Sequence, residues 1–410
     1  MPDRARSILV VNAGSSSVKF AVYGSELGLR FNGELEGMGA KPRLWARHPD
    51  GSSLVDRSWR PHDAPDTQAL IAELTKWLEA HLGETRLAAI GHRVAIGGLE
   101  HSGPVIVTPE VLEKLKALVP LAPLHQPRNL EPIACLGRLH PHLPQVACFD
   151  TAFHRTLPKV AMRYGLPRQL SDAGAHRYGF HGLSYEYIAN RLPGLDARAG
   201  AGRTIVAHLG SGASLCALKA GKSIATTMGF SPLSGLVMAT RPGELDAGLM
   251  IWLIREHGMS VDEVEHMLYH DSGLKGVSGI SGDMRELLAS QSAFAREAIE
   301  LFVHRVAIEM GGLAAALGGL DAIVFTAGIG ERAAPIRKAV CERLAWLGVH
   351  LDVNANTANA HRISMEDASV SVFVIPTDEE LMVATHTRVL ALGASAEAKA
   401  NEIAHNRVVG

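Results

Sequence analysis

The stretch ILVVNAGSSSVKFAVYG, residues 8–24, places two apolar runs on either side of a Gly-Ser-Ser-Ser turn. Runs rich in β-branched residues around a tight turn predict a β-hairpin. This turn carries three hydroxyl groups, and Lys19 follows it by two residues. Backbone N–H groups, hydroxyls and an ammonium group are donors that bind phosphate, so the hairpin is a candidate phosphate-binding element.

A second stretch, TIVAHLGSGASLCALKAG at residues 204–221, has the same pattern in the other half of the chain. When the two are aligned, Gly14 falls on Gly210 and Ser15 falls on Ser211. A single repeat at this separation indicates duplicated domains rather than a solenoid. The sequence therefore predicts two related lobes, each with its own strand–turn–strand unit.

Other segments complete an α/β pattern. Helices are expected at residues 66–82, 109–119 and 292–317, where apolar residues recur at helical spacing. The segment DAIVFTAGIGERAAPIRKAV, residues 321–340, predicts a strand, a glycine turn and a helix. The stretch VPLAPLHQPRNLEP, residues 119–132, is rich in proline and predicts an irregular loop. This mixture of elements predicts layered α/β lobes.

The composition is that of a globular protein with two or three domains. The chain has 410 residues, of which 47% are hydrophobic and 20% are charged, and a domain takes about 150 residues. The net charge of −2 argues against a nucleic-acid partner and against an anionic membrane surface. The four cysteines are widely spaced, and no apolar run approaches the roughly 20 residues of a membrane span. These features predict a cytoplasmic protein.

The segment GIGERA, residues 328–333, leaves a competing hypothesis open. It matches the G-x-G-x-x-A form of a dinucleotide fingerprint, and Asp352 follows where such folds carry an acid. One short fingerprint is a weak signal, and no clear βαβαβ series follows it. An NAD-dependent oxidoreductase and a non-catalytic nucleotide-binding module are therefore alternatives to an enzyme that transfers phosphate.

Charged residues gather near these turns and strand ends. Arg93 follows a strand in GHRVAIGG, Arg241 lies in MATRPGELDAG, and His181 lies in RYGFHG. Three consecutive acids follow a strand and precede an apolar helix: Asp378, Glu379 and Glu380. Such acids serve either as a helix N-cap with first-turn charges or as Mg²⁺ ligands beside substrate phosphates. Together with the glycine turns, they predict a Mg–nucleotide phosphoryl-transfer site.

These motifs, in this order, resemble those of the acetate kinase family, within the acetate and sugar kinase/actin superfamily. The resemblance covers nearly the whole chain. It rests on VNAGSSSVKF, GHRV, LAPLH, FDTAFH, RYGFHG, HLGSG, TMGFSPLSGL, GVSGISGDMR, FTAGIGE and IPTDEEL.

The resemblance implies an α/β fold with two related lobes of the actin-like, ribonuclease H-like ATPase type and a cleft between them. Residues 1–151, joined by a C-terminal helix at 380–410, would form the lobe that carries the carboxylate substrate and the phosphate turn. Residues 152–379 would form the nucleotide-binding lobe. The implied enzyme is a homodimer that transfers the γ-phosphoryl group of ATP reversibly to acetate, giving acetyl phosphate and ADP. Propionate and butyrate kinases of the same family are the alternatives of the same class.

The resemblance also assigns site residues. Those implied in the transfer itself are Arg93, Asp150, His181 and Arg241. Those implied around Mg²⁺ (or Mn²⁺) are Asn12 and Glu379, and those facing the phosphates are Ser15, Ser17 and Lys19. Those implied around the ATP or ADP co-substrate are His208, Leu209, Gly210, Ser211, Gly212, Asp283, Met284, Arg285, Gly328, Ile329, Gly330, Glu331 and Arg332. Those implied around the acyl group are Arg93, Ala95, Leu124, Phe180 and Pro232.

Two points qualify this assignment. A carboxylate substrate has a pKa of about 4 and needs no base, so we interpret Asp150 as an orienting residue rather than a proton donor. The sequence also departs from the family pattern, with Ser211 in place of the usual asparagine, Ile96 in place of histidine and Ala95 in place of valine. The smaller Ala95 leaves room for an acyl chain longer than acetate, since one methylene changes binding by only about 1–3 kcal/mol.

Overall fold

The computed structural model describes residues 6–14, 17–38, 41–60, 66–83, 85–123 and 125–393. Within these ranges the chain forms two compact units. The first unit lies within Met1–Phe153 and Asp378–Gly410, and the second is His154–Thr377. No helix in these ranges is both long enough and apolar enough to cross a membrane.

The first unit is built on an eight-stranded sheet in the order β5-β4-β3-β2-β1-β6-β8-β7. Its helices are α1 (Thr67–His81), α2 (Pro109–Ala117), α3 (Gln126–Leu139) and α16 (Glu379–Leu392). A short 3₁₀ turn, Val119–Leu121, precedes α3. The strands are β1 (Arg6–Ala13), β2 (Val18–Gly24), β3 (Leu29–Glu36), β4 (Arg43–Arg47), β5 (Ser53–Ser58), β6 (Arg86–Val94), β7 (Val105–Ile106) and β8 (Gln145–Phe149).

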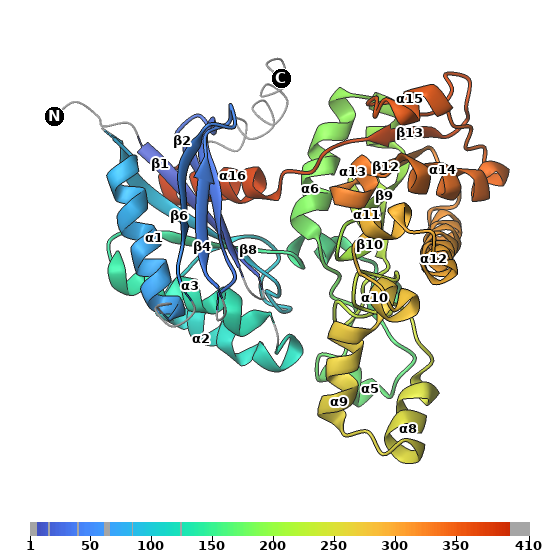
Figure 1. The fold of residues 1–410 in the computed structure, drawn as a ribbon, viewed down its shortest axis with the longest axis horizontal. Coiled ribbons are helices and arrows are strands. Elements are labelled where there is room, and N and C mark those ends of the chain that lie inside the picture. The colour runs from blue at the N-terminus through green and yellow to red at the C-terminus, as the bar shows by residue number, and fades with distance from the viewer. Residues whose placement is uncertain are drawn as a thin grey trace. The chain divides into compact units, whose positions relative to one another are not determined.

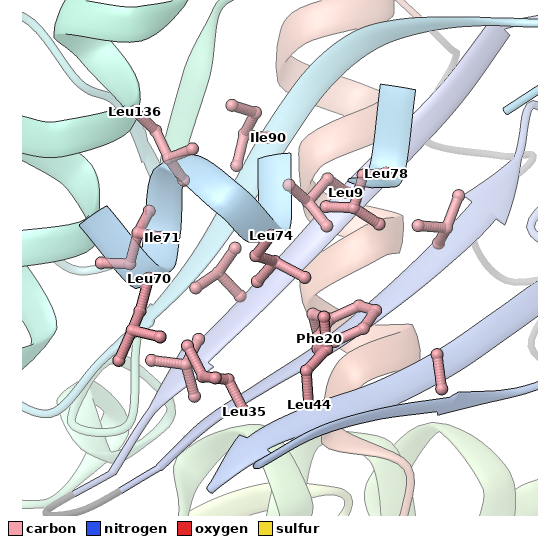
Figure 2. Packing of buried hydrophobic residues seen from close by; sticks show 14 of the residues in the cluster. Leu9, Phe20, Leu35, Leu44, Leu70, Ile71, Leu74, Leu78, Ile90 and Leu136 are labelled. Atoms are coloured by element: carbon pink, nitrogen blue, oxygen red, sulfur yellow. The ribbon is translucent and has the colours of Figure 1, made fainter. Parts of the chain in front are cut away.

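Helix α1 and part of α3 bury one face of this sheet. Leu9, Phe20 and Ile90 project from neighbouring strands toward the apolar side of α1, which includes Leu70 and Leu74 (Figure 2). All five side chains are at most 4% exposed, and each contributes about 1.5–3 kcal/mol by leaving water. Because side chains alternate along a strand, the residues between them point to the opposite face, where α16 packs.

The second unit is built on a five-stranded sheet in the order β11-β10-β9-β12-β13. Helix α12 packs against β9, β10 and β11, and α6 also packs against β9 (Figure 1). The strands are β9 (Arg203–Leu209), β10 (Ala213–Lys219), β11 (Lys222–Thr226), β12 (Ala322–Thr326) and β13 (Ser371–Val374). The helices are α4 (Lys159–Met162), α5 (Arg168–Asp172), α6 (Gly182–Arg191), α7 (Ala197–Ala201), α8 (Ala247–Glu256), α9 (Val261–His266), α10 (Gly273–Ser278), α11 (Met284–Ala289), α12 (Ala293–Leu317), α13 (Ala327–Arg332), α14 (Ala334–Arg343) and α15 (Val353–Thr357).

Five strands of the first sheet have the same topology as the five strands of the second sheet, which confirms the predicted pair of related lobes. In the first unit β3, β2 and β1 pair antiparallel, and β1, β6 and β8 pair parallel. In the second unit β11, β10 and β9 pair antiparallel, and β9, β12 and β13 pair parallel. The hairpin of residues 8–24 is β1–β2 and that of residues 204–221 is β9–β10, so the sequence repeat marks the start of each copy.

Two local predictions are wrong. The stretch predicted as an irregular loop, residues 119–132, contains the first half of α3, with Pro127 in the first turn, where a missing N–H costs little. The predicted glycine turn at residues 327–332 is the short helix α13, which begins directly after β12. Ala327 has φ 63° at this junction, so one left-handed residue replaces the expected turn.

Candidate active site

A row of three polar side chains crosses the central strands of the first unit. In the sheet register, Asn12 on β1 lies opposite Lys19 on β2 and opposite Arg93 on β6. On β6, Gly91 shares a face with Arg93, and a side chain added at Gly91 would meet Val383 and Thr387 of α16. The row therefore lies on the face of the sheet that α16 covers.

Arg93 is the centre of this cluster. Its guanidinium donates to both carboxylate oxygens of Asp150, at 3.0 and 2.7 Å, and lies 3.3 Å from Glu379. A weaker hydrogen bond of 3.4 Å reaches the amide oxygen of Asn12. Asp150 directly follows β8, and its N–H donates to the carbonyl of Val94 at 3.1 Å, so both partners are held by adjacent strand ends.

The cluster carries more negative than positive charge. Burial is the main cause that raises the pKa of Glu379, and the charges of Asp150 and Glu380 also raise it, while Arg93 and Lys19 lower it; the net result is a pKa of about 7. For Arg93, burial alone lowers the pKa, but the neighbouring carboxylates outweigh it and the net shift is upward. Three carboxylates face two cationic side chains, so a further cation would stabilise this arrangement.

The three consecutive acids at the start of α16 divide their roles. Asp378 is the N-cap, and its carboxylate accepts a hydrogen bond of 2.8 Å from the N–H of Leu381. Glu379 and Glu380 lie in the first turn, and Glu380 accepts a 3.5 Å hydrogen bond from the side chain of Asn12. The capping interpretation is confirmed for Asp378, and the other two carboxylates contact the polar row.

In the second unit, His181 is the N-cap residue of α6. It has a left-handed backbone conformation, with φ 57°, which costs a non-glycine residue about 1–3 kcal/mol. Its Nδ1 lies 2.8 Å from the hydroxyl of Ser214, and its ring stacks on His208 with 4.1 Å between centroids. His154 lies beneath this segment and contacts the carbonyl of Phe180 through Nε2 at 2.9 Å.

Arg241 lies beside His181 at the glycine turn between β9 and β10. A side chain at Gly212 would come within 2.8 Å of the Arg241 guanidinium and 3.2 Å of the His181 ring, so both groups lie close against the backbone of this turn. The guanidinium donates to the carbonyl of Pro232 at 2.8 Å. Among the salt bridges of the described ranges, none involves Arg241. Burial lowers the pKa of Arg241 to about 10, against an opposing effect of Tyr269, so it is cationic near neutral pH.

A cavity of about 590 Å³ adjoins the other end of this turn. Gly210 and Ser211 line it, whereas Gly212 faces Arg241 and His181, so the turn connects the cavity to these two side chains. Its size falls within the range of small-molecule sites. The remaining lining residues are Ala239, Gly282, Asp283, Met284, Arg285, Leu288, Gly328, Ile329, Arg332, Ala333 and Pro335.

A buried arginine fixes the position of helix α13, which carries part of the cavity wall. Arg337 is 0% exposed, and it donates to the carbonyls of Gly330 and Glu331 at the end of α13, both at 2.9 Å. Its other donors bind oxygens of Asn356 and Asn359. At the opposite end of α13, the Glu331 carboxylate accepts from the N–H of Ala327 at 2.8 Å. Both ends of this two-turn element are therefore held by side chains.

The structure brings most of the predicted site residues into two groups. The first unit assembles Asn12, Lys19, Arg93, Asp150 and Glu379, and the second assembles His181, Gly212 and Arg241 beside the cavity. Ser15 and Leu124 lie outside the described residues, and the N–H of Gly14 donates to the carbonyl of Ser17 across the first turn. Predicted nucleotide residues that do not line the cavity are His208, Leu209, Gly212, Gly330 and Glu331.

Three supporting residues escaped the sequence analysis: Asn129, His154 and Arg337. Asn129 lies in a segment predicted as a loop, and Arg337 lies in an amphipathic helix with no special signal. His154 belongs to the quoted FDTAFH motif, but nothing in the sequence indicated which backbone group it would hold. Their partners are distant in the chain, so only the fold reveals what they do.

The duplicated sheet, with a glycine turn in each copy, defines the two-lobed actin-like class of phosphotransferases and ATPases. Within that class, residues 7–385 match the model of a family described as the acetokinase family. The chain belongs to this family.

Sequence relatives agree with this assignment. An acetate kinase from Rhodopseudomonas palustris is 54% identical over 394 residues, which covers 94% of this chain and 98% of that protein. An acetate kinase from Nitrobacter hamburgensis is 50% identical over 406 residues, covering 98% of this chain and 99% of that protein.

Solved structures give the same result. A propionate kinase from Francisella tularensis aligns with a TM-score of 0.88 and 38% identity, covering 94% of this chain and 100% of the other. Acetate kinase from Porphyromonas gingivalis aligns with a TM-score of 0.85 and 34% identity over the same shares. Both acetate and propionate kinases thus have the fold of this chain.

Proposed function

We propose that this chain is an acetate kinase, which transfers the γ-phosphoryl group of ATP reversibly to acetate. The observation that carries the proposal is the cluster around Arg93, where a guanidinium is fixed by Asp150 at the edge of a polar row. A guanidinium held in this way binds a carboxylate substrate by paired N–H donors. The cavity in the second unit supplies room for the nucleotide.

The residues of the polar row fit Mg²⁺. Mg²⁺ prefers oxygen ligands and keeps several waters, so it needs only one or two carboxylates plus substrate phosphates. Glu379 would hold it together with the amide oxygen of Asn12, and the excess negative charge of the cluster favours a cation there. In the described ranges, no group of three or more His, Cys, Asp or Glu residues forms a ready metal site, which suits such a sparse ligand set. Bound Mg²⁺ would neutralise phosphate charge during the transfer.

The remaining catalytic residues act by electrostatics and positioning. Phosphoryl transfer spreads negative charge over three oxygens, and cationic donors stabilise that charge. Arg241 is the cation best placed in the second unit, because the described salt bridges include none of its own. His181 adds a second donor on the same side of the glycine turn. Asp150 orients Arg93 and transfers no proton, because a carboxylate nucleophile carries none.

The acyl specificity has a second candidate, propionate. Ala95 follows Arg93 by two residues, and its small side chain leaves more space than a valine. The similarity to a propionate kinase at 38% identity supports this candidate. A single methylene changes selectivity by only about 10–200-fold, so both carboxylates are expected to react.

Turnover with acetate, propionate and butyrate in turn tests the proposal. We expect Mg²⁺-dependent ADP release that requires a carboxylate, with acetate or propionate preferred. The control is the same assay without a carboxylate, in which ADP release is expected to fall to background. ADP release that ignores the carboxylate would indicate an ATPase instead. Binding of NAD but not of ATP would exclude a kinase.

We also propose that the enzyme is a homodimer. Helix α8, labelled in Figure 1, is apolar along most of its length. None of its residues is buried, and Ile251 and Trp252 are 52% and 47% exposed. Apolar surface of this kind marks a protein interface. Ile251→Glu should convert a dimer into a monomer in sedimentation experiments, whereas Lys222→Glu, on an exposed hairpin, should not. A monomeric wild-type protein would contradict the proposal.

The expected compartment is the cytoplasm. The four cysteines Cys135, Cys148, Cys216 and Cys341 are free and buried. Burial raises the pKa of the Cys216 thiol to about 12, which keeps it unreactive. Unpaired thiols suit a reducing compartment.

A further inference from the structure

Helix α3 carries a buried asparagine that joins the ends of two strands. Asn129 is 7% exposed. Its side-chain nitrogen donates to the carbonyl of Ala13 at 2.7 Å, and its oxygen accepts from the N–H of Ala95 at 2.9 Å. Ala13 is the last residue of β1, and Ala95 directly follows β6. One amide therefore satisfies a backbone acceptor on one strand and a backbone donor on the other.

This amide lies where the ladder between β1 and β6 ends. The last register pair of these parallel strands is Asn12 with Arg93. Directly after this pair, β1 leads into the phosphate turn, and the chain that follows β6 leaves the sheet. The Asn129 side chain takes the place of a peptide group there, because it supplies both a donor and an acceptor in one plane.

Further side chains hold the segment that follows Ala95. Gln126, also on α3, accepts from the N–H of Ile96 at 3.3 Å and donates to its carbonyl at 3.0 Å. The N–H of Gly97 donates to the hydroxyl of Thr151 at 3.2 Å. Of these side chains, within the part of the chain that the structure describes, that of Asn129 alone also hydrogen-bonds to the strand that leads into the phosphate turn.

We propose that Asn129 is a positioning residue that fixes the phosphate turn relative to the acyl-binding segment. Its bond to Ala13 holds the start of the turn at Gly14. Its bond to Ala95 holds the segment that follows Arg93. The register of these two segments sets the distance between the phosphate and the carboxylate oxygen. The inference rests on the proposed function, because it assigns both segments to substrates of one reaction.

Two substitutions of Asn129 distinguish its hydrogen bond to Ala13 from its hydrogen bond to Ala95. Asn129→Asp keeps the acceptor for Ala95 but replaces the donor to Ala13 with an oxygen, which repels the carbonyl. Misplacement of a reacting group by an ångström costs about 100-fold. We expect kcat to fall by about 10- to 100-fold while the KM for acetate changes by less than about threefold. Asn129→Ala loses both bonds, so the KM for acetate is expected to rise as well.

Gln145→Glu is the matched control. Gln145 is a buried amide of the same unit that likewise donates to a backbone carbonyl, that of Ile133 at 3.1 Å, while its oxygen contacts His92. The bond that it loses lies at the first residue of β8, whereas the polar row lies at the ends of β1 and β6, so its kcat is expected to stay within about threefold of wild type. If Asn129→Ala does not fold, Asn129→Ser, which is too short to span both partners, takes its place.

Hydrogen–deuterium exchange gives a readout that does not need activity. The Ala95 amide is expected to exchange slowly in the wild type and in Asn129→Asp, and quickly in Asn129→Ala. Equal exchange in all three would overturn the inference, as would equal kcat in Asn129→Asp and Gln145→Glu. A wild-type protein that shows no carboxylate-dependent turnover, but does show this exchange pattern, would refute the proposed function and leave the bridge itself in place.

Discussion

Replacing Asp150 by asparagine tests how the carboxylate cluster acts. The wild-type pair has two hydrogen bonds to Arg93, at 3.0 and 2.7 Å. Asparagine keeps one acceptor and turns an NH₂ group toward the guanidinium. Removing one partner of a buried ion pair costs about 3–5 kcal/mol, and Glu379, 3.3 Å from Arg93, recovers part of this. We therefore expect kcat/KM for acetate to fall by about 30- to 1000-fold, at about 1.4 kcal/mol for each factor of ten.

The dependence of this loss on pH distinguishes an orienting residue from a proton donor. A donor must be protonated, so wild-type activity would fall as pH rises through its pKa, and this limb would vanish in the variant. If the carboxylate only orients Arg93, the variant is expected to lose activity by the same factor at every pH on the basic side of the profile. The assay is ADP release at limiting acetate, measured from about pH 6 to about pH 9.

Asp321→Asn is the control for stability. Asp321 forms the same kind of two-bond pair with Arg203, at 2.9 Å for both bonds, in the second unit. This variant is expected to lose stability but keep its kcat/KM. Near-normal turnover of Asp150→Asn would refute the orienting role. If activity falls at high pH in the wild type but not in Asp150→Asn, our interpretation that Asp150 transfers no proton is wrong.

Three further predictions concern single side chains. Burial lowers the pKa of His92 to about 4, so protonation of His92 favours the unfolded chain. The resulting loss in the free energy of unfolding is absent above about pH 6.5 and grows to about 3 kcal/mol near pH 4. His92→Gln should flatten this fall in urea-unfolding midpoints, and an unchanged slope would contradict the assignment. His154→Asn should lower kcat about tenfold more than His154→Gln, because only glutamine reaches the Phe180 carbonyl that His154 holds at 2.9 Å; equal kcat values would exclude this role. Ala95→Val should lower the propionate-to-acetate ratio of kcat/KM by about 10-fold, and an unchanged ratio would place the acyl group elsewhere.

The sequence predicts the strands and their turns well because their signals are local. Apolar runs around glycine turns identified both hairpins, and the apolar strand β8 ends directly before Asp150. The helix at residues 66–82 is confirmed as α1 because its spacing and its capping aspartate, Asp66, agree. Each of these signals lies within about one element of the chain.

Long-range features were beyond the sequence for a physical reason. The segment before Asn129 contains prolines that locally favour a loop, yet burial against the sheet makes its second half a helix. The junction at Ala327 adopts a left-handed conformation that alanine does not prefer, and Glu331 with Arg337 holds the helix that follows. In both places tertiary contacts outweigh local preference, which a single sequence does not display.

The duplication explains why the candidate site residues come from such distant parts of the chain. In each copy the chain passes to the other unit after its last parallel strand: β8 is followed, beyond α4 and α5, by α6, and β13 is followed by α16. Each of these helices belongs to the unit other than that of the strand it follows. The N-terminus of α6 places His181 beside Ser214, and that of α16 places Glu379 beside Arg93.

The two copies then differ in the charge of one equivalent row. In the first sheet the row is Lys19, Asn12 and Arg93, and in the second it is Ser214, His208 and Thr326. Lys19 and Arg93 of the first row can bind a carboxylate and a metal–phosphate group, whereas the second row carries no Lys, Arg, Asp or Glu and contacts His181 through Ser214 and His208. Under the proposed function, divergence at this row of the repeated sheet assigns the acyl site to the first copy and leaves the second copy to hold the nucleotide and His181.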